Sequence, residues 1–119
     1  MKKSYLSFSL ALLLSTVTAS IHAGPRAILR SPAAGVLCDR YFCADAEGIS
    51  KQLTTAYLGQ KAAAKLFAQG DFDLTEFTFA NGIFCDVKEQ LCREDRYFSK
   101  DGKRNGAISK KYTDLLFKK

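Results

Sequence analysis

The sequence predicts a small α+β domain, stapled by disulfides and built from a duplicated β-hairpin-plus-helix unit. Two stretches resemble each other, because residues 35–58 begin Gly-Val-Leu-Cys-Asp and residues 82–117 begin Gly-Ile-Phe-Cys-Asp. Each stretch later passes into Ile-Ser-Lys, any residue, a bulky apolar residue and Thr. Strand and helix patterns follow one another without the regular alternation of α/β folds. The four cysteines form an even number, as a disulfide framework requires.

Residues 1–23 have the order of a secretory signal peptide. A positive start is followed by an apolar run from Tyr5 to Leu14 and by small residues up to Ala23. The apolar run is shorter than the about 20 residues of a membrane span. We predict cleavage after Ala23, with cleavage after Ala19 as the alternative, and a periplasmic location without a membrane span in the mature chain.

The exported chain would keep 96 of the 119 residues, which suits one domain. Residues 24–34 contain both prolines and are predicted to form a flexible N-terminal arm. Residues 35–119 then form a single α+β domain. A domain of this size buries only about 60–65% of its unfolded surface. Disulfides formed in an oxidising compartment are the expected supplement.

The first unit is predicted to contain a hairpin and a helix, and a second helix follows the unit. Residues 36–39 and 41–44 are rich in β-formers and form a short hairpin. Ser50 suits the N-cap of a helix, and Gly59 suits its C-cap. We predict a bend and a second helix over 60–69, ending at Gly70, with one continuous helix through Gly59 as the alternative.

A further hairpin leads into the second unit. Alternating apolar residues predict a strand over 74–80, and Asn81-Gly82 is a strong turn signal that pairs it with residues 83–86. The second cysteine hairpin extends to about residue 98. A polar loop is predicted for 99–106, after which Ser109 caps a last short helix.

The cysteines are predicted to pair within each hairpin, as Cys38–Cys43 and Cys85–Cys92. A two-residue turn would place the first pair at a non-hydrogen-bonded position, where cross-strand Cβ atoms are closest. The same argument places the second pair at a hydrogen-bonded position, which suits a bridge less well. The two crossed pairings remain alternatives. Zinc sites favour close pairs such as C-x-x-C, which this chain lacks, so we predict no metal and no cofactor.

Histidine, on which many enzymes depend, is missing from the exported part. The one histidine, His22, lies in the leader, so no Ser-His or Cys-His pair can form after cleavage. The acids of the 71–76 segment miss the EF-hand spacing and are interpreted as a helix-exit turn. Asp39 and Asp86 are predicted to anchor hairpin turns. We predict a non-enzyme, with a small two-carboxylate glycosidase as a remote alternative.

The basic charge is concentrated at the end of the chain, where residues 93–119 carry nine basic and four acidic side chains. Arginine mixed with aromatic residues is typical of binding surfaces. Our candidate contact surface comprises Arg93, Arg96, Tyr97, Lys100, Lys103 and Arg104. The alternative is a solvated loop whose aromatic residues belong to the core. Nucleic acid is not an expected partner, because an exported protein rarely meets it.

The phrases Cys38-Asp39, Gly48-Ile49-Ser50 and Tyr57-Leu58-Gly59 resemble those of the YcgJ-like family of small exported enterobacterial proteins. The family is also called Fels prophage protein-like. The stretch from Asp71 to Cys92 is similar to it as well, so the resemblance covers residues 36–119. It implies export and carries over no catalytic residues.

The predicted function is that of a non-catalytic periplasmic protein that binds another macromolecule of the cell envelope, with an anionic partner favoured by the basic loop. The alternative is an inhibitor of an envelope-acting enzyme, in the manner of the small periplasmic lysozyme inhibitors. Lysozymes are usually basic and so is this chain, and like charges argue against that particular target.

Overall fold

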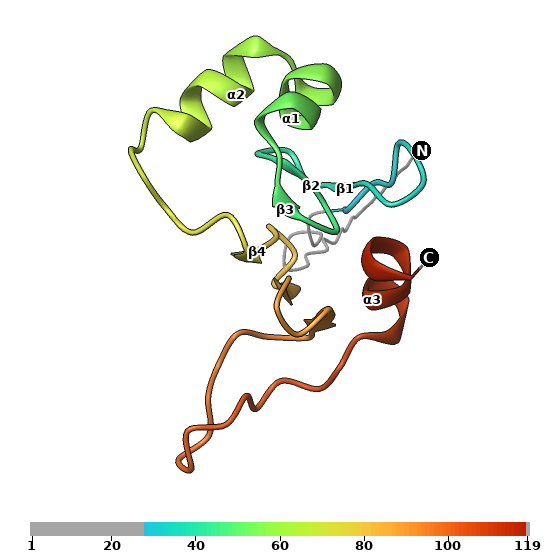
Figure 1. Ribbon diagram of the computed structural model, residues 1–119, viewed down its shortest axis with the longest axis vertical. Helices are drawn as coiled ribbons and strands as arrows, with labels where there is room; N and C mark the ends of the chain where they lie inside the picture. The colour runs from blue at the N-terminus through green and yellow to red at the C-terminus, as the bar shows by residue number, and fades with distance from the viewer. Residues whose placement is uncertain (1–27, 119) are drawn as a thin grey trace, which may run out of the picture.

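The computed structural model describes residues 28–118, which form two small antiparallel sheets and three helices (Figure 1). The first sheet has the order β1 (Leu37–Cys38), β2 (Cys43–Asp45) and β3 (Gly48–Ile49). The second has the order β4 (Glu76–Thr78), β5 (Phe84–Asp86) and β6 (Leu91–Arg93). The helices are α1 (Lys51–Leu58), α2 (Gln60–Phe67) and α3 (Lys110–Phe117). The predicted α+β class with two hairpin-plus-helix units is confirmed.

Helices α1 and α2 begin and end near the residues that the sequence indicates. The Ser50 hydroxyl accepts a hydrogen bond from the Leu53 N–H at 3.0 Å. Gly59 separates the two helices with a φ of 98°, a conformation that favours glycine. The predicted bend is therefore confirmed and the continuous helix is wrong. The second helix ends at Phe67, two residues earlier than predicted, because the Gly70 N–H turns back to the Phe67 carbonyl.

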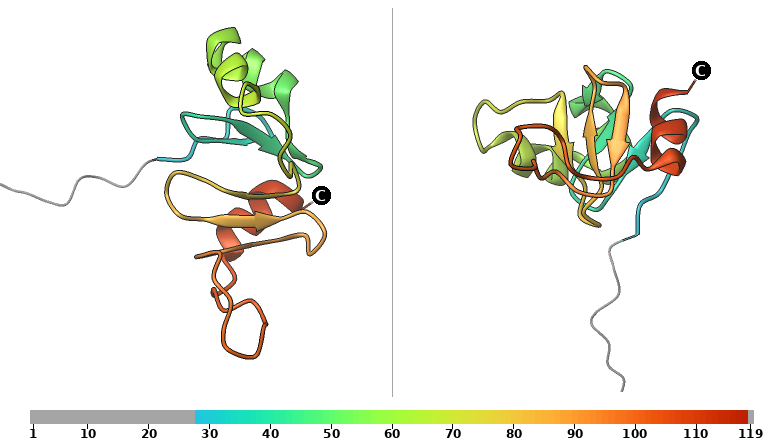
Figure 2. Two further views of the ribbon diagram at one scale, coloured as in Figure 1. Left: turned by 90° about the vertical axis from the view of Figure 1, so that its left-hand side faces the viewer. Right: turned by 90° about the horizontal axis from the view of Figure 1, so that it is seen from below.

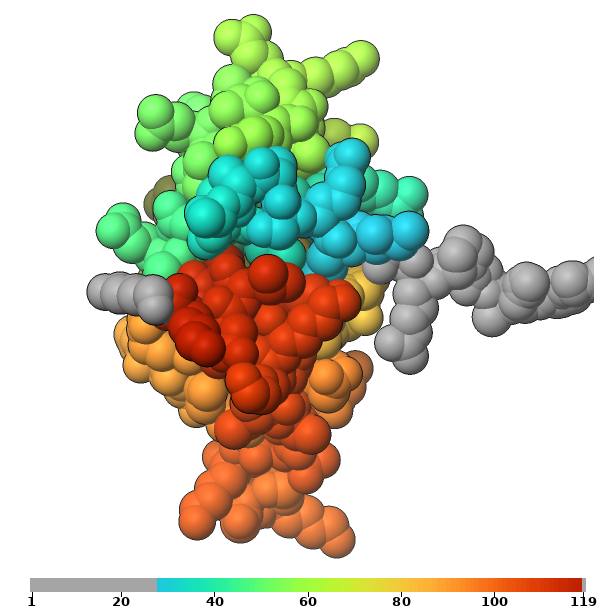
Figure 3. Space-filling model, turned by 90° about the vertical axis from the view of Figure 1, so that its right-hand side faces the viewer, coloured from blue at the N-terminus to red at the C-terminus, as the bar shows by residue number. Residues whose placement is uncertain are grey.

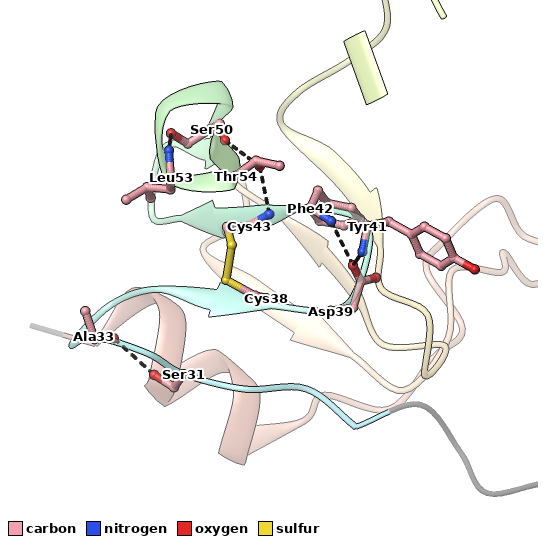
Figure 4. The surroundings of a disulfide bond; sticks show 10 residues. All are labelled: Ser31, Ala33, Cys38, Asp39, Tyr41, Phe42, Cys43, Ser50, Leu53 and Thr54. Carbon is pink, nitrogen blue, oxygen red and sulfur yellow. Dashed lines mark hydrogen bonds between the residues drawn. A yellow bond between two sulfur atoms is a disulfide. The ribbon is translucent and has the colours of Figure 1, made fainter. Parts of the chain in front are cut away.

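In the first unit, α1 completes the hydrogen bonds of the second cysteine. The Cys43 N–H donates to the Thr54 hydroxyl at 3.0 Å, and the Cys43 carbonyl accepts from the Ser50 N–H at 2.9 Å. Thr54 is fully buried and donates its own hydroxyl proton to the Ser50 carbonyl. Figure 4 shows this cluster next to the Cys38–Cys43 bridge. The first turn of α1 thus satisfies the backbone groups of Cys43 that face away from β1.

The second unit repeats these contacts with α3. The Cys92 N–H donates to the Thr113 hydroxyl at 2.8 Å, and the Ser109 N–H donates to the Cys92 carbonyl at 2.8 Å. The Ser109 hydroxyl accepts from the Tyr112 N–H, so Ser109 is the N-cap that we predict. Corresponding residues of the two units therefore bond to the backbone of the second cysteine in the same way. The threonine hydroxyls differ in their acceptor, which is the Ser50 carbonyl for Thr54 and the Cys92 carbonyl for Thr113.

Both predicted bridges are present, with Cα–Cα distances of 4.1 Å for Cys38–Cys43 and 4.0 Å for Cys85–Cys92. The hydrogen-bonded position predicted for Cys85 and Cys92 is wrong. The backbone groups of Cys92 bond to α3 and leave none for Cys85. The prediction assumed a two-residue turn, whereas residues 87–90 form a four-residue turn that shifts the alternation by one pair.

The start of the described chain is tied to the first sheet. Arg30 and Cys38 exchange two backbone hydrogen bonds, of 2.9 and 2.8 Å, and Leu29 packs against the core. Leu29 and Arg30 of the arm predicted for residues 24–34 are therefore attached to the body of the protein, and the flexibility of the arm stays a prediction. The free edge of β1 presents backbone groups that need partners, and this segment supplies them. The predicted signal peptide, both cleavage sites and residues 24–27 lie outside the described residues.

One hydrophobic core joins the two units. The ring of Phe42 in the first unit stacks on Phe79, which directly follows β4 in the second sheet, with centroids 4.9 Å apart. Phe77 meets both rings edge-on. Aliphatic residues from both units complete the cluster, among them Leu37, Ile49, Ile83 and Leu116. The core therefore lies between the sheets, and each hairpin contributes one side of it.

A close backbone contact adds to this junction. The Ile49 N–H donates to the Leu74 carbonyl at 2.8 Å. A Cβ atom on Gly48, which has a φ of 120°, would lie 2.2 Å from the Leu74 carbonyl oxygen, so only glycine fits there.

None of the helices within residues 28–118 is long and apolar enough to cross a membrane.

The Thr54 and Thr113 hydroxyls, in the first turns of α1 and α3, should stabilise the fold. Thr54→Val and Thr113→Val keep the side-chain shape but leave a cysteine N–H without its acceptor. We expect each to lower the free energy of unfolding in urea by about 1–3 kcal/mol. Thr55→Val is the matched control, because that exposed hydroxyl bonds only within α1, and it should change stability by less than about 0.5 kcal/mol. Equal losses for Thr54→Val and Thr55→Val would contradict this assignment.

Candidate functional site

The second unit carries a long insertion that the first unit lacks, and we call residues 94–107 the tip hairpin. In the first unit, Ala44 pairs with Ile49 across a short turn. In the second, the corresponding pair is Arg93 and Ile108, and the tip hairpin lies between them. Figures 1 and 2 show it at the end of the molecule opposite to α2, and Figure 3 shows it protruding from the body.

The tip hairpin has its own backbone pairing, although the sequence predicts only a polar loop for 99–106. The Ser99 N–H donates to the Lys103 carbonyl at 2.8 Å, and the Asn105 N–H donates to the Tyr97 carbonyl at 2.9 Å. The Asp101 carboxylate accepts from the Ser99 hydroxyl and the Lys103 N–H. These hydrogen bonds, the Ser99 hydroxyl first, lower the pKa of Asp101 below its usual value. The turn at the tip is therefore ordered.

Arg104 clamps the tip hairpin onto the second sheet. Its Nη2 lies 3.1 Å from Glu76 Oε1 and 3.1 Å from Asp86 Oδ2. The guanidinium carbon lies 4.5 Å from the ring centroids of both Phe84 and Phe98. Only 15% of the side chain is exposed, so the pairs are better shielded from solvent than ordinary surface salt bridges. Arg104 has a structural role, because Glu76 and Asp86 of the same chain already neutralise its charge.

Arg93 holds the base of the same hairpin. Its Nη1 donates to the Gly106 carbonyl at 2.9 Å, and its Nε lies 3.5 Å from Glu89 Oε1. The two strands of the base pass so closely that a Cβ on Gly106 would lie 2.5 Å from the Asp95 carbonyl oxygen. Of the six residues predicted as a contact surface, Arg93 and Arg104 therefore face inward and position the other four.

The remaining four residues are exposed on the protruding part. Arg96, Lys100 and Lys103 form no ion pair within residues 28–118. Tyr97 is 61% exposed, with the Arg96 guanidinium 5.8 Å from its ring centroid. Phe98, which the sequence analysis left out, is 58% exposed and belongs with them. We call these residues the cationic tip: Arg96, Tyr97, Phe98, Lys100 and Lys103.

A shallow hollow lies beside the cationic tip, between the β4–β5 turn and the base of the tip hairpin. Its volume is about 340 Å³, and it is lined by Thr78, Phe79, Ala80, Gly82, Glu94, Asp95, Arg96 and Tyr97. Arg96 and Tyr97 thus belong both to the hollow and to the tip. A partner that covers the two rings could also place a side chain in this hollow.

The acidic stretch at 71–76 forms the turn that the sequence predicts. Asp73 Oδ1 accepts hydrogen bonds from the Thr75 hydroxyl at 2.7 Å and from the Thr75 N–H at 2.8 Å. These two bonds lower the pKa of Asp73. Within residues 28–118, no three or more His, Cys, Asp or Glu side chains are grouped so that they could hold a metal ion.

Fold and site together define a small disulfide-bonded α+β domain that carries a protruding cationic hairpin. A sequence model of the YcgJ protein family matches residues 29–117, and the chain belongs to this family. It is 58% identical over 89 residues to "Uncharacterized protein YcgJ" of Escherichia coli (strain K12), which covers 75% of this chain and 73% of that protein. No solved structure matches the chain. The resemblance stated from the sequence is confirmed.

The Arg104 clamp should control the order of the tip hairpin. Arg104→Gln leaves the buried Asp86 carboxylate without its cation and removes both ring contacts. We expect a loss of about 1–3 kcal/mol in unfolding free energy and faster amide exchange at Ser99 and Asn105. The control Lys103→Gln, at an exposed position, should stay within about 0.5 kcal/mol of the parent. Unchanged exchange in Arg104→Gln would contradict the clamp.

Proposed function

We propose that the protein is a non-catalytic interaction protein of the periplasm and that its cationic tip contacts an anionic macromolecule of the cell envelope. The observation that carries the proposal is the make-up of the tip, with three cations free of ion pairs among residues 28–118 and two exposed aromatic rings on one clamped hairpin. Arginine and aromatic residues together are enriched where proteins bind partners.

The arrangement supports binding more than a solvated loop. A loop without a partner gains nothing from exposing Tyr97 and Phe98, because apolar surface is more stable when covered. The Arg104 clamp and the backbone pairs hold the tip hairpin in shape before any partner arrives. A pre-organised surface loses less conformational entropy on binding than a mobile one. The tip hairpin therefore has the properties of a contact element.

The charge pattern supports an anionic partner. The chain up to residue 92, without the predicted leader, is nearly neutral, so any long-range field comes from residues 93–119. Lipopolysaccharide, a peptidoglycan-linked anionic polymer and an acidic protein surface all meet this requirement. Catalysis by a carboxylate pair has less support, because buried Asp39 and Asp86 are bound to backbone N–H groups and, for Asp86, to Arg104.

Inhibition of an envelope-acting enzyme is the second candidate. The observation in its favour is the protrusion of the tip hairpin, because a narrow clamped hairpin can enter the cleft of a larger protein (Figure 3). A cleft lined by acids would complement its cations. Under this alternative the same residues make the contact, and the partner recovered is an enzyme whose activity falls.

Binding should depend on the three free cations of the tip. Arg96→Gln, Lys100→Gln and Lys103→Gln combined should weaken capture of a partner from periplasmic and outer-membrane extract by about tenfold, at about 0.5 kcal/mol for each charge. Arg104 is kept so that the hairpin stays clamped. Binding by the parent should fall with rising salt, since exposed charges are screened over about 8–10 Å.

The matched control removes three exposed lysines elsewhere, with Lys61→Gln, Lys88→Gln and Lys118→Gln combined. It changes net charge by the same amount and should keep the parent's affinity. If the tip variant holds the same partner as tightly as the parent at low salt, the cationic tip is not the contact surface. An enzyme among the captured proteins, inhibited by the parent and not by the tip variant, would favour the second candidate.

We also propose that the chain is exported and cleaved after Ala23. The two disulfides support this location, because such bridges persist in oxidising compartments. The periplasmic form should have the intact mass of a chain that begins at Gly24, less four hydrogen atoms for two bridges. Recovery of the full chain from the cytosol with reduced cysteines would contradict export, and a mass beginning at Ser20 would point to the other cleavage site.

A further inference from the structure

We propose that the first unit carries a second binding site, for a small anionic amphiphile such as a medium-chain fatty acid. The site is a groove between the β1–β2 turn and α2. Its volume is about 340 Å³, and it is lined by Arg40, Tyr41, Ala62, Lys65, Leu66 and Gln69. This volume lies within the range of small-molecule sites, about 300–1,000 Å³. The inference does not depend on the function proposed for the cationic tip.

One wall of the groove is formed by α2 and the turn that follows it. Ala62 and Leu66 lie one turn apart on α2, and Gln69 lies in the turn after the helix. Ala63 is buried, and Phe67 packs against the core from the neighbouring side. The core thus holds α2 through Ala63, Leu66 and Phe67, and Leu66 also borders the groove. Unit two has no counterpart of α2, so the groove is particular to unit one.

The other wall is a turn fixed by a buried carboxylate. Asp39 is 3% exposed, and its Oδ1 accepts from the N–H groups of Tyr41 at 2.7 Å and Phe42 at 3.0 Å. Its Oδ2 accepts from the Ala80 N–H at 2.7 Å. Figure 4 shows the Tyr41 ring directed away from the disulfide and from this anchor. Both walls are in place before a ligand arrives, which reduces the ordering cost of binding.

Charge and apolar surface together define the ligand. Arg40 and Lys65 stand on opposite walls, form no ion pair within residues 28–118, and no carboxylate lines the groove. The Arg40 guanidinium lies 5.2 Å from the Tyr41 ring centroid, a contact that leaves its N–H donors available for an oxyanion. Leu66, Ala62 and the Tyr41 ring supply the apolar surface.

A ligand with only one of these features would fit less well. An inorganic anion would pair with the cations and leave the apolar side chains of the groove exposed to water. A neutral hydrocarbon chain would cover the walls and leave the cations without a counter-charge. A carboxylate on an alkyl chain satisfies both, because apolar burial contributes about 0.8 kcal/mol for each methylene group covered and the carboxylate can accept from Arg40 in a bidentate fashion.

The test uses amide chemical shifts of the mature protein titrated with decanoate below its micelle concentration. We expect saturable shifts at residues 40–41 and 62–69 and none at the tip hairpin, which lies at the opposite end of the molecule (Figures 1 and 2). Acetate and 1-decanol, which carry the charge and the chain separately, should each bind at least about tenfold more weakly. Arg40→Gln with Lys65→Gln should weaken decanoate binding by about tenfold as well.

The control removes two cations outside the groove, Lys61→Gln on the same helix and Lys88→Gln in the β5–β6 turn, and should leave the decanoate affinity unchanged. Equal affinity for 1-decanol would overturn the role of the cations. Absence of saturable shifts, an equal loss in the control, or shifts confined to the tip hairpin would overturn the site. The tip variant defined above should bind decanoate like the parent, so the two proposals fail independently.

Discussion

The second cysteine of each hairpin is the residue on which the structure depends. Its sulfur is bonded to the neighbouring strand, while its backbone N–H and carbonyl are bonded to a Thr hydroxyl and a Ser N–H at the start of a helix. The bridge, one strand of the sheet and the start of a helix are thereby fixed at one position. A chain of this size has a marginal hydrophobic core. Such a junction matters because buried N–H and carbonyl groups must find partners inside the molecule.

This junction explains where the two units can differ. The pair Ala44–Ile49 in one unit and Arg93–Ile108 in the other closes the segment between second cysteine and helix. Anything inserted between the paired residues leaves the junction intact, because loop length changes the closure entropy only slowly. The second unit uses this freedom for the tip hairpin. The first unit instead extends beyond its helix, and α2 forms one wall of the groove. Each candidate binding surface is thus formed by residues added outside the contacts that the two units share.

Local features of the fold could be predicted from the sequence, and distant ones could not. Serine N-caps, the Gly59 bend and the bridge pairing follow from signals within a few residues. The backbone pairing of Arg30 with Cys38 could not be predicted, because no side-chain pattern indicates a backbone contact of this kind. Of the candidate site, the exposed cations and Tyr97 could be predicted. The inward role of Arg104 could not, because its partners lie 18 and 28 residues away in the chain.

The two aspartates that follow the first cysteines show how local and distant contacts are connected. Asp39 and Asp86 each use one carboxylate oxygen to hold the hairpin turn that follows. The second oxygen reaches out of the unit's own turn, to the Ala80 N–H from Asp39 and to Arg104 from Asp86. Both carboxylates are buried, and an unpaired buried charge would be strongly destabilising. The turn beside the groove and the clamp of the cationic tip are therefore held by the same device, and the rigidity of each surface follows from the need to satisfy one buried carboxylate.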